Sequence, residues 1–575
     1  MPDGESKSEE VIVKSGEIRY TIIIDNVYGG FFYSNYRGIA MKKLLRKIQV
    51  LVISITCILT ITSCEKTDDI SMNDKQADYV TATLFSDVSF WEPPVWDTKA
   101  GTITGDISAK TGVKIETEVP KQEADVKLKL KLLNDDLPDI ISITDDISIQ
   151  QLVSSGKVWK LEEFLKEYKP DSHLLTQFPE DIKQQLINRD GAWYAIPSHM
   201  NSADARKIWK SSLSYWDDVE KYYSNNAIIW NKALLEKLGL HTEELQTEEQ
   251  VLAAFETAKQ HGIIPLLLDG DMYQESLKYL QWSFGAEWVD AEGNFKDILL
   301  QPESKEALKF LNTAIRNEYA DSKVLMYENV KIKELIASGR VLCFIGNVAN
   351  TSAVEEEWTS TGVVLSSQNT TPVFGRKMQA QTGWMQTFIS KDCKHPKEVA
   401  EWLDYMTSDE GKMLWFYGYE GKDYTIGEDG IVQRAKERED ATAHYTETGF
   451  CAWWMFENEA WKRSLSAPGE GYGELLMAFG KYKDVAVYDE SLLMFPSDLL
   501  PVGSDEYNME KEITAWKDSQ ILVTILTQTD EAFETEYQTL INGLKERGIE
   551  RIDEIKNQAY QANCETYHSR IEKAN

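Results

Sequence analysis

The sequence of 575 residues predicts an α/β protein. Strand patterns alternate with helix patterns early in the chain, and a second alternating set begins near its middle. Several runs, such as residues 138–143, are almost continuously apolar, which is typical of parallel strands buried on both faces. Strand, helix and strand in this order favour parallel sheets joined by right-handed crossovers.

The first set opens at residues 79–85, an apolar run that predicts a strand. Residues 113–117 alternate polar and apolar side chains, which also indicates a strand. Residues 124–133 are amphipathic with helical spacing. The set is predicted as strand 79–85, helix 102–111, strand 113–117, helix 124–133 and strand 138–143.

The second set begins with a strand at residues 226–230. Its first helix, 233–238, stops at Gly239, a residue that favours the left-handed conformation found after helix ends. The next helix runs from Thr247, a good N-cap residue, to Lys259. Further predicted elements are strands 263–268 and 385–389 and helices 304–317, 331–338, 396–405, 531–548 and 551–562.

Cys64 follows an export-type segment. Residues 41–47 form a short basic stretch, residues 48–59 are almost wholly apolar, and small residues precede the cysteine. This order indicates a signal peptide, which is too short for an ordinary membrane span. Its ending resembles the bacterial lipobox, which implies that Cys64 carries lipid; the alternative is a buried apolar helix with an incidental cysteine. We therefore expect residues 1–40 to be an upstream extension from a misplaced start, 41–63 the signal peptide and 64–78 a polar tether.

Composition excludes several classes of function. The net charge of −33 disfavours nucleic acid as a partner. The 17 Trp and 26 Tyr indicate a folded chain in which most aromatic side chains belong to the core and some face a cleft. Neither a cofactor nor a metal is predicted. The remaining cysteines (343, 393, 451 and 564) lack the spacing of metal ligands, and the chain has no HExxH, GxSxG, Walker or CxxC motif.

Several short motifs, in order, carry a family resemblance. They are residues 111–115 (TGVKI), 137–141 (LPDII), 191–197 (GAWYAIP), 229–239 (IWNKALLEKLG), 337–344 (ASGRVLCF), 394–400 (KHPKEVA) and 418–424 (GYEGKDY). Together they resemble the extracellular solute-binding proteins of carbohydrate ABC importers, in the maltose-binding-protein-like family and its larger oligosaccharide-binding lipoprotein branch.

The resemblance implies a two-lobe, periplasmic-binding-protein-like fold with hinge strands and a C-terminal helical extension. We expect lobe 1 to comprise residues 79–197 and 344–391, and lobe 2 to comprise residues 198–343 and 392–575, the latter including the C-terminal helices. The implied function is capture of an oligosaccharide for the membrane permease by a monomer, lipid-anchored on the extracellular face of the cell membrane. The alternatives are a receptor of this fold for a peptide or other solute, and a surface-anchored glycosidase or polysaccharide lyase.

Candidate ligand-binding residues in lobe 1 follow predicted strands, where ligands of open α/β sheets bind. Trp91 and Trp96 lie in a loop with two prolines and no helical period, so we expect their rings to stack on sugar, with core burial as the alternative. The segment that carries Asp145 resembles the acidic hydroxyl-binding loop of maltose-binding protein. Asp146 is expected to cap the helix that follows.

The remaining candidates are spread over the second half of the chain. Asp271 and Tyr273 follow strand 263–268 in a loop that resembles an aromatic-bearing loop of maltose-binding protein. Trp282 lies on an amphipathic stretch, where core burial competes with a ligand role. The others are Asn347, in a hinge-like loop and suited to amide hydrogen bonding, Trp384, near the presumed hinge, and Trp454, in a lid or the core.

Overall fold

The structure is a computed structural model that describes residues 79–211, 213–377, 380–436, 445–467, 473–481 and 484–566. All of these residues belong to one compact unit, Ala77–Asn575. The predicted upstream extension, signal peptide, lipidated Cys64 and tether lie outside the described residues.

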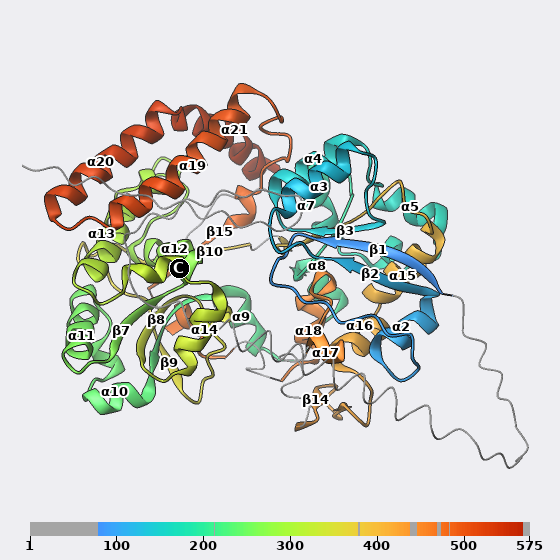
Figure 1. Cartoon of the computed structure of the whole chain (residues 1–575), viewed down its shortest axis with the longest axis horizontal. Helices are drawn as coiled ribbons and strands as arrows, with labels where there is room; N and C mark the ends of the chain where they lie inside the picture. The colour runs from blue at the N-terminus through green and yellow to red at the C-terminus, as the bar shows by residue number, and fades with distance from the viewer. Residues whose placement is uncertain are drawn as a thin grey trace, which may run out of the picture. The chain divides into compact units, whose positions relative to one another are not determined.

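The first sheet has five strands in the order β2-β1-β3-β12-β4. Its three parallel members pair as predicted, with Val80 opposite Val113 and Leu84 opposite Ile140. The last two strands run antiparallel to their neighbours. The strands are β1 (Val80–Ser86), β2 (Val113–Glu118), β3 (Ile140–Ile143), β4 (Ile196–Pro197) and β12 (Gln386–Ile389), with α2 (Ile103–Thr111) and α3 (Ala124–Leu133) as the first crossovers (Figure 1).

Local signals explain where these elements start and stop. The Thr102 hydroxyl accepts a hydrogen bond from the Gly105 amide and caps α2. Gly112 ends the helix at φ 75°, a conformation that costs glycine little, and lets β2 begin at the next residue. These signals are readable in the sequence, and the predicted bounds agree with the structure within two residues.

The second sheet has four strands in the order β7-β8-β6-β9. Strand β8 is parallel to β7 and antiparallel to β6, which also pairs antiparallel with β9. A capping box between Thr247 and Gln250 opens helix α11. The elements are β6 (Asn226–Asn231), α10 (Lys232–Leu238), α11 (Glu248–Gln260), β7 (Ile264–Leu268), β8 (Val341–Asn347) and β9 (Trp358–Gly362).

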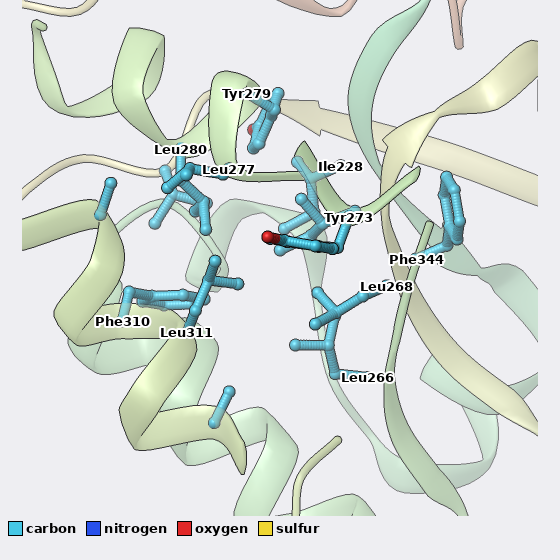
Figure 2. Close-up of a cluster of buried hydrophobic side chains, with 14 of the residues drawn as sticks. Ile228, Leu266, Leu268, Tyr273, Leu277, Tyr279, Leu280, Phe310, Leu311 and Phe344 are labelled. Atoms are coloured by element: carbon cyan, nitrogen blue, oxygen red, sulfur yellow. The ribbon is translucent and has the colours of Figure 1, made fainter. Parts of the chain in front are cut away.

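The core of this second body lies between its sheet and two helices, α12 (Tyr273–Phe284) and α13 (Pro302–Arg316). Figure 2 shows side chains from β6, β7 and β8 facing those of the two helices. Every labelled side chain there is at most 4% exposed. Packing of this density fixes the helices on the sheet and leaves little freedom for α12, whose other residues reach the cleft described below.

The predicted bounds of the lobes are wrong after residue 343. Strands β8 and β9 belong to the second sheet, so the chain has not yet returned to lobe 1 at residue 344. The segment that contains α15 (Pro396–Thr407) and α18 (Glu459–Leu465) packs into the core around the first sheet, so residue 392 does not start lobe 2. A buried apolar strand can pair with either sheet, and residue patterns alone do not show which.

We therefore use lobe 1 for the first sheet and the side chains packed with it, and lobe 2 for the second sheet and its core. The chain passes from lobe 2 to lobe 1 between β10 (Val373–Arg376), which packs on the lobe 2 core, and β11 (Ala380–Thr382), which pairs with β5 (Met200–Ser202). It is back in the lobe 2 core at Leu475. Strand β15 (Ala486–Asp489) then pairs in parallel with β10.

Three C-terminal helices complete lobe 2: α19 (Asp505–Ile525), α20 (Asp530–Glu546) and α21 (Ile549–Thr566). Helix α19 lies against α13 and α20 (Figure 1). The sequence predicts the second and third of these helices but misses α19, whose few buried residues give no clear helical stripe. In the described part of the chain, no helix combines the length and apolar character needed to cross a membrane.

Asp139 links three segments of lobe 1. Its buried carboxylate accepts hydrogen bonds from the Thr83 amide and hydroxyl, both at 2.7 Å, and from the Lys394 amide at 2.8 Å. Burial raises the pKa of this carboxyl, but the hydrogen bonds outweigh burial and hold the pKa below its usual value of 3.8. A lowered pKa in the folded state contributes stability above the unfolded pKa and loses it as the pH falls.

Asp139→Asn should lower the free energy of unfolding at pH 7 by about 1–3 kcal/mol, because buried donors lose a charged acceptor. The loss should shrink as the pH falls below about 4, since the unfolded wild-type chain then takes up a proton that the folded carboxylate resists, and this erodes the advantage of the carboxylate over the amide. Urea unfolding at pH 7 and pH 3 measures both effects. The exposed Asp136→Asn is the control; equal losses for the two variants at pH 7 would contradict the assignment.

Candidate ligand-binding cleft

Two cavities of about 590 and 570 Å³ share Trp384, Gly383 and Lys377 in their walls. The larger one is lined by both lobes and by the β10 region between them, so a molecule inside it would contact both lobes at once. Its polar and aromatic lining includes Asn226, Glu275, Lys278, Trp282 and Asn347 of lobe 2, His199, Trp384, Glu457, Glu459 and Lys462 of lobe 1, and Arg376, Lys377 and Glu490 of the β10–β15 region.

Trp384 is presented by a turn that requires glycine. Gly383 has φ 53°, and a Cβ placed on it would lie 1.8 Å from the carbonyl oxygen of Ser198. The turn directs Trp384 outward just before β12, and its side chain remains 42% exposed. The indole faces Phe90, itself 64% exposed, with ring centroids 6.3 Å apart and planes within 15°.

Trp454 completes this group, since its ring lies 6.2 Å from that of Phe90. We call Phe90, Trp384 and Trp454 the aromatic platform. The sequence predicts both tryptophans as candidates, and the structure brings them together around Phe90. Phe90 was missed, although it precedes Trp91 in the loop that the sequence singles out; only its position opposite residues far along the chain distinguishes it.

The expectation that Trp91 offers its ring to a ligand is wrong. Trp91 is 1% exposed, stands edge-on to Trp453 at 6.1 Å, and donates its indole hydrogen to the Ala452 carbonyl at 3.1 Å. Trp96 is half-buried, donates to the Ser108 hydroxyl at 2.8 Å and meets Trp453 at 5.4 Å. Both rings belong to the core of lobe 1, because the loop that carries them folds against residues 445–453.

The roles expected of Asp145 and Asp146 are exchanged. Asp145 is the N-cap of α4 (Asp146–Ser155), and its carboxylate accepts a hydrogen bond from the Ser148 amide at 2.7 Å. Asp146 is exposed and lines the smaller cavity. The helix begins one residue earlier than the sequence indicates, so the first carboxylate caps it and the second is left facing the cavity.

The lobe 2 candidates separate into core and cleft residues. Tyr273 is 3% exposed and points into the core shown in Figure 2, so the prediction of a ligand-facing ring is wrong. Asp271 is exposed but lines neither cavity. Trp282 is 3% exposed and packs edge-on against Phe374, yet it also lines the larger cavity.

Asn347 lies in the wall of the larger cavity, where the sequence expects a hydrogen-bonding amide. Its own side-chain oxygen accepts a hydrogen bond from the Ala349 amide at 3.0 Å, and its backbone amide donates to Asp269 at 2.8 Å. Burial raises the pKa of Asp269 to about 7. The hydrogen bond to this carboxyl therefore positions the loop that carries Asn347 in the cavity wall.

His199, Glu457 and Lys462 form a partly buried charged group in the lobe 1 wall. Glu457 lies 3.0 Å from the His199 ring nitrogen and 2.8 Å from the Lys462 ammonium. Burial raises the pKa of Glu457, but the two basic partners outweigh burial and hold it far below its usual range. The same interaction raises the pKa of His199 against the opposing effect of its burial.

Glu459 joins this group, and its carboxylate, that of Glu457 and the His199 imidazole place three possible metal ligands within 4.8 Å of one another. The Lys462 ammonium already supplies positive charge at this point, 3.7 Å from Glu459. A metal ion would have to displace it. The arrangement is therefore explained by an internal ion-pair network.

The sequence pattern did not predict that His199, Lys278 and Glu457 would line the cleft. It gave no indication of a role for Arg376 or Lys377 either. No motif surrounds them, because each becomes a cleft residue only through the way the chain crosses between lobes. The two-lobe cleft itself, however, was expected.

The model of the bacterial extracellular solute-binding protein family matches residues 96–413, more than half of the chain. The chain belongs to this family. No curated protein matches it. Its fold is that of solved two-lobe binding proteins, all at low sequence identity.

Three of these structures cover most of this chain. The S. pneumoniae ABC-transporter substrate-binding protein FusA in complex with kestose is 15% identical, with a TM-score of 0.59 over 85% of this chain and 100% of that one. The alginate-binding protein AlgQ2 without calcium ion is 14% identical, with a TM-score of 0.61 and the same coverage. An HMO-binding solute-binding protein from Bifidobacterium longum infantis is 13% identical, with a TM-score of 0.58 over 84% and 98%.

The different environments of two tryptophans can be tested by stability. Trp91→Ala should lower the free energy of unfolding by about 3–5 kcal/mol, because it removes a fully buried ring. Trp384→Ala should lower it by less than about 1 kcal/mol, because that ring is largely in solvent. Urea unfolding of both variants without ligand measures the difference, and similar losses would contradict the assignment of Trp91 to the core.

Proposed function

We propose that this protein is the substrate-binding component of an ABC importer, which captures an oligosaccharide between its two lobes and delivers it to the membrane permease. The observation that carries the proposal is the aromatic platform beside two cavities whose walls include Trp384. Sugar rings present C–H faces that pack on aromatic planes, and few other solutes need an exposed platform of this kind. Of the three solved structures named above, one is in complex with kestose, one is of an alginate-binding protein and one is of an HMO-binding protein.

The cleft also offers hydrogen-bonding partners for hydroxyl groups. Amides and carboxylates such as Asn226, Glu275 and Glu490 line the larger cavity. Ligand pockets of about 300–1,000 Å³ accommodate small molecules, and each of the two cavities is within this range. A ligand that contacts both lobes favours the arrangement in which both sets of contacts are made, and this difference can be sensed by a permease.

A catalytic role for Glu457 is a weaker explanation of the same cleft. A glycosidase needs a carboxylic acid whose pKa is raised so that it can protonate the leaving group. Glu457 has its pKa shifted in the opposite direction by Lys462 and His199. We infer that these residues order the cavity wall and do not turn the sugar over.

A panel of neutral and acidic oligosaccharides, with short peptides for comparison, tests the function by titration calorimetry. At least one oligosaccharide should bind and be recovered uncleaved, and Trp384→Ala should weaken its binding by about tenfold, since an aromatic contact contributes about 0.5–1.5 kcal/mol beyond its buried area.

Trp159→Ala is the matched control, because that half-buried lobe 1 tryptophan lines neither cavity. Binding of peptides alone would favour a receptor for another solute. Hydrolysis or elimination products from the bound sugar would favour the enzyme. If the two substitutions weakened oligosaccharide binding equally, the aromatic platform would not be part of the binding site.

We further propose that the protein is a lipoprotein anchored to the extracellular face of the cell membrane and acts as a monomer. The order of a basic stretch, an apolar run and small residues before Cys64 supports the lipid anchor. The polar residues 65–78 are long enough to separate a folded domain from the lipid surface.

Cys64→Ser should abolish lipid attachment, because serine lacks the thiol that accepts the lipid. Expressed in a bacterium with lipoprotein processing, the variant should move from the membrane fraction to the soluble fraction or accumulate as uncleaved precursor. Fractionation and intact-mass measurement show the result. Cys57→Ser, within the apolar run, is the matched control and should leave both unchanged; an unchanged Cys64→Ser protein would refute the anchor.

A further inference from the structure

Three cations in the larger cavity have no carboxylate partner. Lys278, Arg376 and Lys377 all line it, and within the described residues none of them forms an ion pair. Lys462 in the same cavity is paired with Glu457 at 2.8 Å. Unpaired cations in this position are unexpected in a chain of net charge −33, where carboxylates outnumber basic groups by 94 to 61.

The surroundings of the two lysines leave their ammonium groups available. Lys278 projects from α12 and lies over the Trp282 ring, 4.5 Å from its centroid. Lys377 follows β10 directly and lines both cavities. Both side chains are half-buried. Arg376 beside them donates to the Glu220 carbonyl at 3.1 Å and lies over the Tyr223 ring.

The acidic groups around these cations are engaged elsewhere or lie beyond ion-pair distance. Glu275 accepts a hydrogen bond from the Asn226 amide at 2.8 Å, and Glu490 accepts one from the Tyr488 hydroxyl at 3.3 Å. Glu457 and Glu459 are shared with Lys462 and His199. Asp146 faces the smaller cavity opposite Arg189 and Lys377, without an ion pair to either.

Burial lowers the pKa of Lys377. The carboxylates of Glu490 and Asp146 partly oppose this effect, and the positive charges of Lys278 and Arg189 reinforce it. Two ammonium groups that repel one another in a partly desolvated cavity carry a free-energy cost, which an anion placed between them removes. Charge-assisted hydrogen bonds to a carboxylate or sulfate are also stronger than those to a neutral hydroxyl.

We propose that the ligand is an acidic oligosaccharide, whose carboxylate or sulfate group binds between Lys278 and Lys377 while a sugar ring packs on Trp384. This inference rests on the proposed function and specifies the class of sugar. Lobe 2 and the crossing segment then recognise charge, and lobe 1 recognises the ring face.

The test measures binding of the protein to paired probes of equal length. One pair is an oligogalacturonate and its methyl ester, and the other is a sulfated chondroitin oligosaccharide and its desulfated form; the first pair reports on carboxylate alone, and the second adds sulfate. A neutral maltooligosaccharide and a fructooligosaccharide complete the set. Wild type should bind at least one acidic probe tightly, and its esterified or desulfated partner roughly tenfold to a hundredfold more weakly.

Lys278→Gln and Lys377→Gln should each lose most of this preference, because their affinity for the acidic probe should fall much further than their affinity for its uncharged partner. Lys129→Gln is the matched control, because it makes the same change of charge at an exposed position of α3 that lines neither cavity. Melting temperatures without ligand confirm that each variant is folded. That of Lys377→Gln should be at least as high as that of wild type, since a repulsive charge has been removed.

If only neutral oligosaccharides bind, and both lysine variants bind them as wild type does, the inference is overturned and the proposed function stands. If no carbohydrate of either kind binds but a peptide does, the proposed function fails, and the inference with it. An acidic preference that persists in both lysine variants would also overturn the inference, because other residues would then supply the recognition.

Discussion

The packing of Trp91 against residues 452 and 453 holds lobe 1 together across the whole length of the chain. Its indole hydrogen bond to the Ala452 carbonyl joins residues 361 positions apart. Trp453, fully buried, contacts both Trp91 and Trp96. The core around the first sheet is therefore complete only with residues near 450 in place, so its contacts join residues that are far apart in the sequence.

This dependence extends to the cleft. Trp454 follows Trp453 directly and Glu457 comes four residues after it, so the segment that closes the core also supplies one side of the aromatic platform and the acid of the charged group. Phe90 precedes Trp91 and supplies another part of the platform. Core packing on one residue of each pair fixes the exposed neighbour, which gives the cleft rigid walls at little additional entropy cost.

Local physical signals predicted much of the fold. Thr102, Gly112 and the capping box at Thr247 act within a few residues of themselves, and the elements they bound were found nearly as predicted. The lobe boundaries failed because β8 pairs with β6 and β7 in ways that its apolar sequence does not encode.

The candidate site was predicted less well for the same reason. Trp384 and Asn347 were found in the cleft, but Trp91 is a core residue, and a proline-stiffened loop with two tryptophans gives no sign of the partner segment that covers it. Asp145 and Asp146 differ by one residue, which is less than the accuracy with which a helix start can be assigned from sequence.

Two kinds of charge in the cleft have opposite meanings. Lys462, buried between two glutamates, is satisfied within the protein, and its removal would leave carboxylates without a counterion. Lys377 has no such ion pair among the described residues, so the cost of its partial burial is only partly offset within the fold, by the more distant Glu490 and Asp146. Because it lies where the chain crosses from lobe 2 to lobe 1, a group bound to it contacts the segment that any change in the arrangement of the lobes must move. Binding energy at Lys377 is thereby coupled to the lobe arrangement, which is the quantity that a permease would have to sense.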